Sequence, residues 1–379
     1  MTSATADDVR RALTGVIDPE IRRPITDLDM VGDIVVESGH ARVDIRLTIV
    51  GCPAADSIER DVDAAVRAVP GVAAATINVG VMTPDQRRAL TERLRGGRAA
   101  RVMPFGPDSL TRVIAVTSGK GGVGKSTLTA NLAVALAARG VRVGVIDADV
   151  HGFSIPGLMG LVHDGAPATP TRVGELILPP VAHGVKVISI GMFLRAGDSG
   201  AVVWRGPMLH RTLAQCLERV FFGVVDVLLI DMPAGPGDMA ISVGQMLPHA
   251  EVVVVTTPQS AAADVAVRSG LAAGKTGQRV VGVIENMGPF TLPDGTVMSL
   301  FGEGGGNAVA AALSTDDEVV PLLASVPLSV PLREGGDDGM PAVLAHPEDP
   351  AARVISALAD RLLTSGPSLV GRKLPLSTN

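Results

Sequence analysis

The chain has 379 residues, of which 46% are hydrophobic, and its formal net charge is -6. This length predicts two or three domains that can each bury a self-sufficient core. The acidic balance and an aromatic content of only 2%, with no Tyr, argue against a general nucleic-acid or membrane-surface binder, because neither a broad positive field nor a base-stacking platform is available.

The number of cysteines and the first residues of the chain indicate in which cellular compartment the protein is expected. Two cysteines, Cys52 and Cys216, are too few for a disulfide framework and suit a reducing environment. Met1–Arg11 is polar and is not followed by the apolar core of a signal peptide, and the longest apolar runs have only the length of strands. We therefore expect a cytoplasmic protein without a membrane anchor.

The first 95 residues have the pattern of a small α+β domain. The expected helices cover residues 7–14, 54–69 and 83–94, and the expected strands cover 33–37, 41–50 and 75–79. Ser38 and Gly39 supply a turn between the first two strands. Residues 96–108 are rich in Gly, Arg and Pro, and we expect them to be a linker.

From residue 109 to residue 364 the pattern changes to short apolar runs separated by helical stretches. The runs cover residues 113–117, 141–146, 185–190, 225–230, 252–256, 280–284 and 322–326. Continuous apolar strands that alternate with helices indicate a mostly parallel sheet covered on both faces. We predict a doubly wound α/β domain that binds ligands beyond the carboxyl ends of its strands, followed by a disordered tail over residues 365–379.

A glycine-rich loop follows the first of these strands and matches G-x-x-x-x-G-K-[ST], the P-loop that cradles nucleotide phosphates. Its glycines let backbone N–H groups turn toward phosphate oxygens, its lysine meets the β/γ charge, and its serine hydroxyl coordinates Mg²⁺. A helix expected over 126–138, with Leu128, Leu132 and Leu136 on one face, supplies the N-terminal dipole. The predicted nucleotide-binding residues are Gly119, Lys120, Gly121, Gly122, Val123, Gly124, Lys125, Ser126 and Thr127.

Lys120, the second residue of this loop, is unusual for a P-loop. One interpretation is a solvated lysine beside a glycine-rich turn. The alternative is a catalytic cation that reaches a second nucleotide across a dimer interface and stabilises transition-state charge in trans.

Two of the expected strands end in acids, at the edge of the sheet where a nucleotide would lie. Asp231 is the candidate that holds Mg²⁺ through water, Asp147 supports the metal shell, and Asp149 orients or activates the attacking water. An acid after a strand is also a common turn or helix-capping residue, which is the competing interpretation for each. Residues 235–237, Gly-Pro-Gly, suit a switch that senses the γ-phosphate.

The loop over 119–127 resembles the deviant Walker A sequence of the MinD/ParA and nitrogenase-iron-protein group, which carries the extra lysine. Within that group the chain is most similar to the Mrp/ApbC iron–sulfur cluster carriers. The further segments that carry the resemblance are DADVHGFSIP at 147–156, WRGPMLH at 204–210, DMPAGPGD at 231–238, TTPQ at 256–259, ENM at 285–287 and DDGMP at 337–341.

Residues 1–95 resemble the small domain that many of these carriers have, which also occurs alone in iron–sulfur assembly factors. The similar segments are VIDPE at 16–20, ITDL at 25–28 and TIVGCP at 48–53. The resemblance implies a homodimeric, Mg²⁺-dependent ATPase that binds an iron–sulfur cluster and passes it to apoprotein clients, with iron–sulfur assembly proteins as further partners. It also implies that Asn286 contacts adenine and that Lys120 acts across the dimer.

The cysteines depart from the pattern of these carriers, which usually have C-P-x-C shortly after the Asn-Met pair. Leu292 and Gly295 occupy the two cysteine positions, and neither supplies the thiolate that clusters need. Cys52 precedes an expected helix, whose N-terminus favours thiolate, so it is either a cluster ligand or transfer thiol, or a small buried hydrophobe. Cys216 lies in a helix expected over 213–220 and is interpreted as a core residue.

Three functions compete on this sequence. The first is an ATP-hydrolysing carrier of iron–sulfur clusters, and the second is an ATPase that acts as scaffold or regulator of cluster assembly without a bound cluster. The third is a MinD/ParA-like positioning switch, which needs an amphipathic tail or a basic face. The end of this chain, residues 369–379, has only Arg372 and Lys373 and no amphipathic period, so we expect no membrane or nucleic-acid partner.

Overall fold

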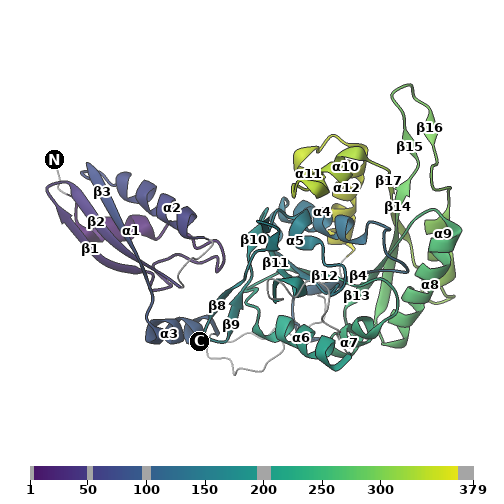
Figure 1. The fold of residues 1–379 in the computed structure, drawn as a ribbon, viewed down its shortest axis with the longest axis horizontal. Helices are drawn as coiled ribbons and strands as arrows, with labels where there is room; N and C mark the ends of the chain where they lie inside the picture. Colours follow the sequence, from purple (N-terminus) through teal and green to yellow (C-terminus); the bar gives the residue numbers. More distant parts are fainter. Residues whose placement is uncertain (1–3, 49–53, 96–103, 194–205, 366–379) are drawn as a thin grey trace.

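The computed structural model describes residues 4–48, 54–95, 104–193 and 206–365, which form two units (Figure 1). Cys52, most of the expected linker and the expected tail lie outside the described residues. None of the helices in the described ranges is long and apolar enough to span a bilayer.

The N-terminal unit is built on a three-stranded sheet with helices, which is the small α+β domain that the sequence predicted. Its elements are α1 (Ala6–Leu13), β1 (Val31–Glu37), β2 (His40–Leu47), α2 (Ala55–Arg67), β3 (Ala74–Val81) and α3 (Pro84–Arg95). The strand order is β1-β2-β3, with β1 and β2 antiparallel and β2 and β3 parallel. Every second residue of β2 is buried, so one face of the sheet carries the core against α1 and α2.

The larger unit contains an eight-stranded sheet in the order β10-β11-β5-β12-β4-β13-β14-β17. Its strands are β4 (Arg112–Ser118), β5 (Val143–Asp147), β10 (Val181–Ala182), β11 (Val185–Ser189), β12 (Val227–Asp231), β13 (Glu251–Thr256), β14 (Arg279–Gly288) and β17 (Leu322–Pro327). All neighbours pair in parallel except β10 with β11. The predicted doubly wound, mostly parallel α/β sheet is thereby confirmed.

Helices cover both faces of this sheet (Figure 1). The described helices are α4 (Lys125–Ala137), α5 (Ile155–Leu158), α6 (Gly206–Arg219), α7 (Asp238–Met246), α8 (Ser260–Lys275), α9 (Gly305–Leu313), α10 (Val330–Asp337), α11 (Ala342–Ala345) and α12 (Pro350–Thr364), with a 3-10 turn over Ile190–Phe193. The helices α4, α5, α11 and α12 pack together on one face, and α6, α7, α8 and α9 form the layer on the other.

Helix α4 is more deeply buried than the sequence suggested. Leu128, Leu132 and Leu136 are buried as expected, but so is almost every residue between them, including Asn131 and Val134. The reason is that α5, α11 and α12 surround the helix on the sides that do not face the sheet. The helix that carries the phosphate loop is therefore packed against the sheet on one side and against other helices on the rest.

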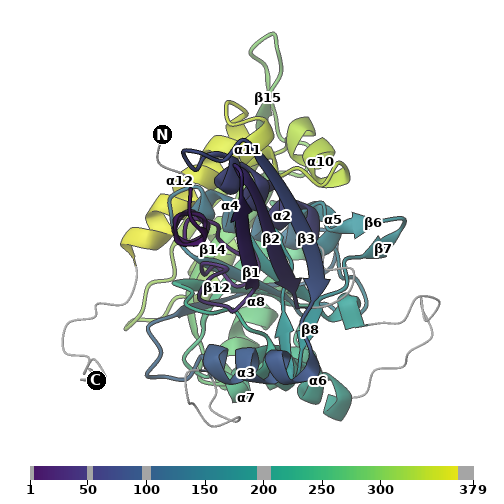
Figure 2. The same ribbon diagram turned by 90° about the vertical axis from the view of Figure 1, so that its left-hand side faces the viewer.

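Three small hairpins were absent from the sequence-based prediction. They are β6–β7 (Val162–His163 and Ala166–Pro167), β8–β9 (Thr171–Val173 and Leu176–Leu178) and β15–β16 (Phe290–Thr291 and Val297–Met298). The hairpin β15–β16 projects from the larger unit, whereas β8–β9 points toward the N-terminal unit and lies close to α3 (Figures 1 and 2).

The hairpin β8–β9 completes the core of the N-terminal unit. Val173, Leu176 and Leu178 are buried in one apolar cluster with the inward side chains of α1, α2 and the three-stranded sheet. Thr91 Oγ1 of α3 also donates a hydrogen bond to the carbonyl oxygen of Val173 at 3.0 Å. The two units therefore share a core, although the chain enters the larger unit long before β8.

Candidate functional site

The phosphate loop links the end of β4 to the first turn of α4, and its glycines are required for different reasons. A Cβ on Gly119 would lie 2.3 Å from the backbone nitrogen of Ala266, so this glycine allows close packing against α8. Gly122 and Gly124 have φ of +80° and +79°, the left-handed region that glycine adopts without strain. A Cβ on Gly124 would also lie 2.2 Å from Nδ2 of Asn286.

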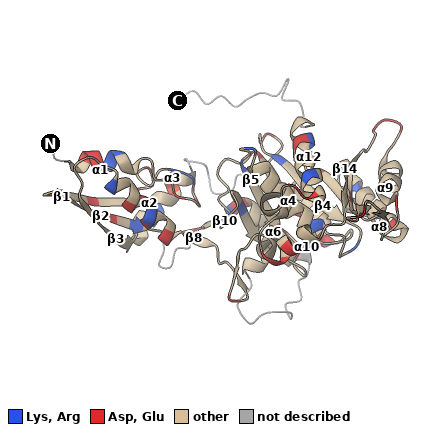
Figure 3. Cartoon of the chain, turned by 90° about the horizontal axis from the view of Figure 1, so that it is seen from above, with Lys and Arg blue, Asp and Glu red and all other residues tan. Residues whose placement is uncertain are grey.

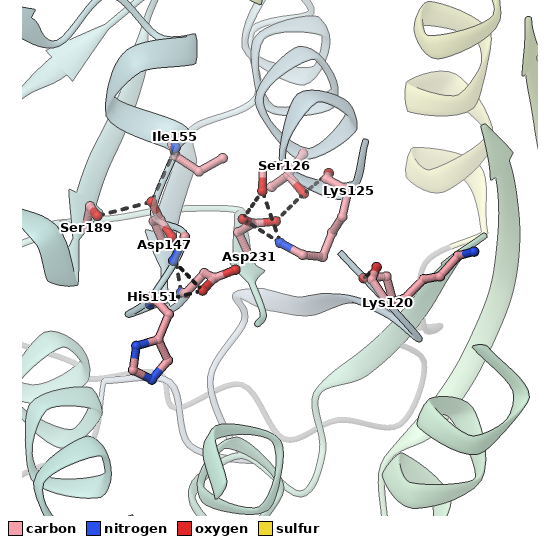
Figure 4. Close-up of polar contacts among 12 residues, drawn as sticks. Lys120, Lys125, Ser126, Asp147, His151, Ile155, Ser189 and Asp231 are labelled. Atoms are coloured by element: carbon pink, nitrogen blue, oxygen red, sulfur yellow. Dashed lines mark hydrogen bonds and ion pairs between the residues drawn. The ribbon is translucent and has the colours of Figure 1, made fainter. Parts of the chain in front are cut away.

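Three side chains converge on Asp231 at the end of β12 (Figure 4). Lys125 Nζ lies 2.7 Å from Asp231 Oδ2, and Ser126 Oγ donates a hydrogen bond to the same oxygen at 2.6 Å. Thr129 Oγ1 donates to Oδ1 at 3.0 Å. Strands β4 and β12 are parallel neighbours in the sheet, which brings the predicted lysine, serine and aspartate together. Burial raises the pKa of Asp231, and the contacts from Lys125, Ser126 and Thr129 oppose that shift.

Asp147 ends the neighbouring strand β5 and lies opposite Asp231 in the strand register. It is completely buried, and its Oδ2 accepts hydrogen bonds from Ser189 Oγ at 3.1 Å and from the backbone N–H of Ile155 at 3.2 Å. Burial, together with the nearby charge of Asp231, raises the pKa of Asp147 to about 7. Two buried carboxylates at adjacent strand ends give an oxygen-rich edge of the kind that Mg²⁺ prefers.

Asp149 lies in a tight turn directly after this strand. Its Oδ1 accepts hydrogen bonds from the backbone N–H groups of Gly152 at 2.9 Å and His151 at 3.3 Å. This is the turn geometry that the competing interpretation of the sequence expected. The role of Asp149 in orienting water stays a prediction.

Lys120 does not join the group around Asp231. In Figure 4 its side chain extends away from Lys125 and Asp231, although both lysines belong to the same loop. The described part of the chain offers its ammonium group no hydrogen-bond or ion-pair partner. Lys120 is therefore available to contact a group outside its own site.

Asn286, near the end of β14, contacts the phosphate loop through its side chain. Its Nδ2 donates a hydrogen bond to the carbonyl oxygen of Val123 at 2.9 Å, and its side chain is buried. The next residue, Met287, has a positive φ of 58°, a strained conformation for a residue with a Cβ. The expected contact between Asn286 and adenine stays a prediction, and the structure adds a second role in holding the loop.

The segment after Asp231 lies across the end of β4. The backbone N–H of Met232 donates to Val116 and that of Gly235 donates to Ser118, the last residue of β4. Gly235 has a φ of +82°, a left-handed conformation that glycine adopts without strain, and the switch role of this segment stays a prediction. The switch segment leaves β12 and the phosphate loop leaves β4, and these parallel neighbours place the two segments side by side at one edge of the sheet.

Two side chains of this site, Thr129 and Ser189, were not predicted from the sequence. Thr129 stands one helical turn after Lys125, a spacing that places both on the same side of α4. Ser189 ends β11, beside Asp147. The first was detectable from its i, i+4 position, whereas the second required the strand order, which the sequence does not contain.

Of the two cysteines, Cys216 lies in the described residues. Cys216 is completely buried in α6, and burial raises the pKa of its thiol to about 12. Leu292 and Gly295 lie at the tip of the β15–β16 hairpin, between its two strands. Among the described residues no group of three or more His, Cys, Asp or Glu side chains gathers to hold a metal ion.

A phosphate loop between a buried strand and a buried helix, with an acid at the end of the adjacent strand, defines this α/β unit as a P-loop NTPase. A family model described as the NUBPL iron-transfer P-loop NTPase matches residues 109–363. A second, described as an iron-sulfur cluster assembly protein, matches residues 6–79.

Curated relatives cover nearly the whole chain. It is 52% identical over 371 residues to the iron-sulfur cluster carrier protein of Mycobacterium tuberculosis (strain ATCC 25618 / H37Rv), covering 97% of this chain and 96% of that protein. It is 37% identical over 360 residues to the protein of the same name from Synechocystis sp. (strain ATCC 27184 / PCC 6803 / Kazusa), with 94% and 97% covered. The chain belongs to this family of iron–sulfur cluster carrier P-loop NTPases.

A solved structure supports the fold of the larger unit. The septum site-determining protein MinD of Pyrococcus horikoshii OT3, complexed with Mg-ADP, is 28% identical with a TM-score of 0.50. The match covers 67% of this chain and 98% of that chain.

Proposed function

We propose that this protein binds ATP with Mg²⁺ at the phosphate loop and hydrolyses it. The observation that carries the proposal is the convergence of Lys125 and Ser126 on one oxygen of Asp231. A lysine, a hydroxyl and a carboxylate at the start of a helix and the end of the adjacent strand are the groups that bind a nucleotide triphosphate and its metal ion.

Each side chain has a role in this proposal. Lys125 binds the β- and γ-phosphates together with the backbone N–H groups of the loop, and Asn286 holds the loop and contacts adenine. The oxygens of Ser126, Asp231 and Asp147 suit Mg²⁺, which neutralises charge on the phosphates when it is bound. Asp149 orients the attacking water, and Lys120 of a partner protomer stabilises the developing charge.

The ATPase proposal is tested by replacing Asp231 with Asn, which keeps the shape of the side chain and removes its charge. We expect Asp231→Asn to lower the Mg²⁺-dependent kcat about 100-fold, the usual effect of removing one group that stabilises the transition state. The matched control is Asp226→Asn, because Asp226 directly precedes β12, at the opposite end of this strand from Asp231, and pairs with Arg142 away from the loop. Equal activity of both variants would contradict the assignment of Asp231.

We further propose that a homodimer of this protein carries iron–sulfur clusters in the cytoplasm and passes them to apoprotein clients. Support comes from the two matched families and from the name that the relatives with 52% and 37% identity share. The two units share a core, so movements of the ATPase unit at the phosphate loop can reach the assembly-type unit.

The number of available cysteine thiolates limits how this protein can ligate an iron–sulfur cluster. The chain has two cysteines, and the thiol of Cys216 is buried with a raised pKa, so it does not offer a thiolate. We therefore assign the thiolate to Cys52, which gives two per homodimer, and other ligands complete the coordination. The small number of thiolates, with Leu292 and Gly295 at the two usual cysteine positions, also favours a second candidate function. In that candidate the protein is an ATPase scaffold of cluster assembly and holds no cluster.

Carrier function is tested by cluster transfer to an apoferredoxin, followed by the visible absorption of the ferredoxin. We expect transfer from the reconstituted wild type to depend on Mg-ATP, and the Lys125→Ala variant to lose that dependence because it cannot bind the phosphates. A rate of transfer that is the same with and without Mg-ATP in the wild type would contradict a nucleotide-driven carrier.

A further inference from the structure

A pocket lies at the seam between the two units, away from the nucleotide site. Its volume is about 500 Å³, within the range of small-molecule sites. Residues of both units line it: Ile21, Arg22, Arg23 and Leu94 from the N-terminal unit, and Arg142, Lys186, Phe221, Phe222, Gly223 and Val224 from the larger unit.

Four cationic side chains meet at this seam, and two of them have carboxylate partners. Arg142 forms an ion pair with Asp226, and its Nε donates to Asp226 Oδ2 at 2.9 Å. Lys186 is 1% exposed, lies 5.3 Å from the ring centre of Phe221, and is attracted electrostatically to the acids of the 18–20 loop. These two cations are therefore largely balanced by the protein itself.

The other two cations are not balanced. Arg22 donates a hydrogen bond to the carbonyl oxygen of Gly184, and the described residues supply no carboxylate to it. Burial and the neighbouring positive charge of Arg142 lower the pKa of Arg22. Arg23 is exposed, and its guanidinium has no partner in the ranges that the structure describes. Positive charges held together without counter-charges favour an anion.

The backbone at the seam is shaped around these side chains. Arg22 has a φ of +62°, a left-handed conformation in which glycine or asparagine would be less strained than arginine. Gly223 has a φ of +65°, and a Cβ there would lie 3.7 Å from Lys186 Nζ. The turn at Arg22 belongs to the N-terminal unit and the turn at Gly223 to the larger unit. Each turn brings the backbone close to the cationic side chains of the pocket.

Elsewhere in the part of the chain that the structure describes, charges of both signs are mixed. In Figure 3, Lys and Arg alternate with Asp and Glu over both units. The arginines at the seam are therefore a local feature and not part of a broad basic face.

We propose that the seam binds a small multivalent anion of the phosphate class, which bridges the two units. Arg22 and Arg23 contribute from the N-terminal unit, and the guanidinium fork suits phosphate oxygens. Arg142 and Lys186, whose charges are largely balanced by acids of the protein, line the pocket from the larger unit, and Phe221 and Phe222 give it apolar walls. The bound anion neutralises the charge of Arg22 and Arg23, the two cations of the pocket that lack carboxylate partners among the described residues.

The proposal is tested by calorimetric titration of inorganic pyrophosphate into the full-length protein. The phosphate loop is first saturated with Mg-ADP, so that added pyrophosphate reports on a second site. We expect one saturable site in the wild type, and a loss of affinity of about tenfold or more in Arg22→Gln and in Arg23→Gln, because each removes a charged contact. The matched control is Arg42→Gln, which removes one positive charge from an exposed position on β2.

Arg23→Gln keeps the test valid if Arg22→Gln disturbs the turn, because Arg23 is exposed and its replacement should leave the melting temperature unchanged. Absence of saturable binding in the wild type would overturn the proposal, as would an equal loss in Arg42→Gln or unchanged affinity in Arg23→Gln. A parallel titration with AMP separates two sources of the phosphate: tighter binding of AMP assigns it to a nucleotide, and tighter binding of pyrophosphate to a free phosphate.

Discussion

Gly124 is the residue on which the shape of the phosphate loop depends most. It combines a φ of +79° with a neighbour, Asn286 Nδ2, that a Cβ would approach to 2.2 Å. Gly140 has the same φ of +79° but open space where its Cβ would lie. The two glycines therefore separate the cost of backbone strain from the cost of displacing Asn286.

We expect Gly140→Ala to lower the free energy of unfolding by about 1–2 kcal/mol, the cost of a left-handed alanine. Gly124→Ala should cost more and should also abolish binding of Mg-ADP, because Asn286 must leave Val123. Urea unfolding and calorimetric titration with Mg-ADP measure the two effects. Normal Mg-ADP affinity in Gly124→Ala would show that Asn286 does not hold the loop in its binding conformation.

The role of Lys120 across the dimer can be tested by mixing two inactive variants, because a lysine that acts only in its own protomer would not restore activity. If it acts in trans, a mixed dimer of Lys120→Ala and Asp231→Asn contains one complete site, because the second protomer supplies the missing lysine. Each variant alone should be almost inactive, and an equimolar mixture should recover about a quarter of the wild-type ATPase rate, as random pairing into C2 dimers predicts. An additive rate in the mixture would place Lys120 in its own site or in solvent.

Much of the candidate site was predictable because it is local in sequence. Lys125 and Ser126 belong to a motif whose spacing defines their chemistry, and Asp231 follows a buried strand. Ser189 and the loop contact of Asn286 were not predictable, because they depend on which strands lie side by side. Whether Asp149 acts in a turn, on water, or both is also beyond what its position in the sequence indicates.

At the scale of elements, the β8–β9 hairpin is the piece of the larger unit on which the N-terminal unit depends. Val173 and Leu178 are completely buried in the N-terminal core. We expect Leu178→Ala to destabilise that unit by about 2–5 kcal/mol, the usual cost of such a cavity. Hydrogen exchange of the full-length protein should then speed up in α1, α2 and β2.

The matched control is Leu229→Ala in β12, which is equally buried but belongs to the core of the large sheet. It should speed up exchange in that sheet and leave the N-terminal unit protected. If Leu178→Ala changed exchange only within the larger unit, the shared core would not be a stabilising one.

The main strands and helices were predictable, because long apolar runs and helical periods are strong local signals. The strand pairs at 162–167, 171–178 and 290–298 were not, because strands of two or three residues have no measurable period. The burial of α4 was underestimated for another reason. Of the helices that cover it, α11 and α12 lie more than 200 residues further along the chain, and their packing is a tertiary effect.

At the scale of the whole molecule, the buried charges at the seam predict how stability depends on pH. Burial, with a smaller effect of Asp18, raises the pKa of Glu20 from 4.5 to about 7. Between these values the folded state binds a proton that the unfolded state has lost, so stability decreases as pH rises from about 4.5 to 7. A neutral Glu20→Gln should lose this dependence.

We expect the free energy of unfolding of Glu20→Gln, relative to wild type, to increase by up to about 3 kcal/mol over this pH range. Urea unfolding of both proteins at several pH values measures the difference. The control is Glu37→Gln, which removes an exposed carboxyl from β1 of the same unit. A constant difference between Glu20→Gln and wild type would show that Glu20 is not buried at the seam in solution.

The central claim for the whole molecule is that a homodimer carries an iron–sulfur cluster and that Cys52 supplies its thiolates. Anaerobic reconstitution with iron and sulfide, followed by visible absorption and iron and sulfide counts, tests it most directly in wild type, Cys52→Ser and Cys216→Ser. We predict a cluster in wild type and in Cys216→Ser, because Cys216 is buried in α6, and none in Cys52→Ser. No cluster in the wild type would contradict the carrier assignment and leave an ATPase scaffold, and a full cluster in Cys52→Ser would remove Cys52 from its coordination.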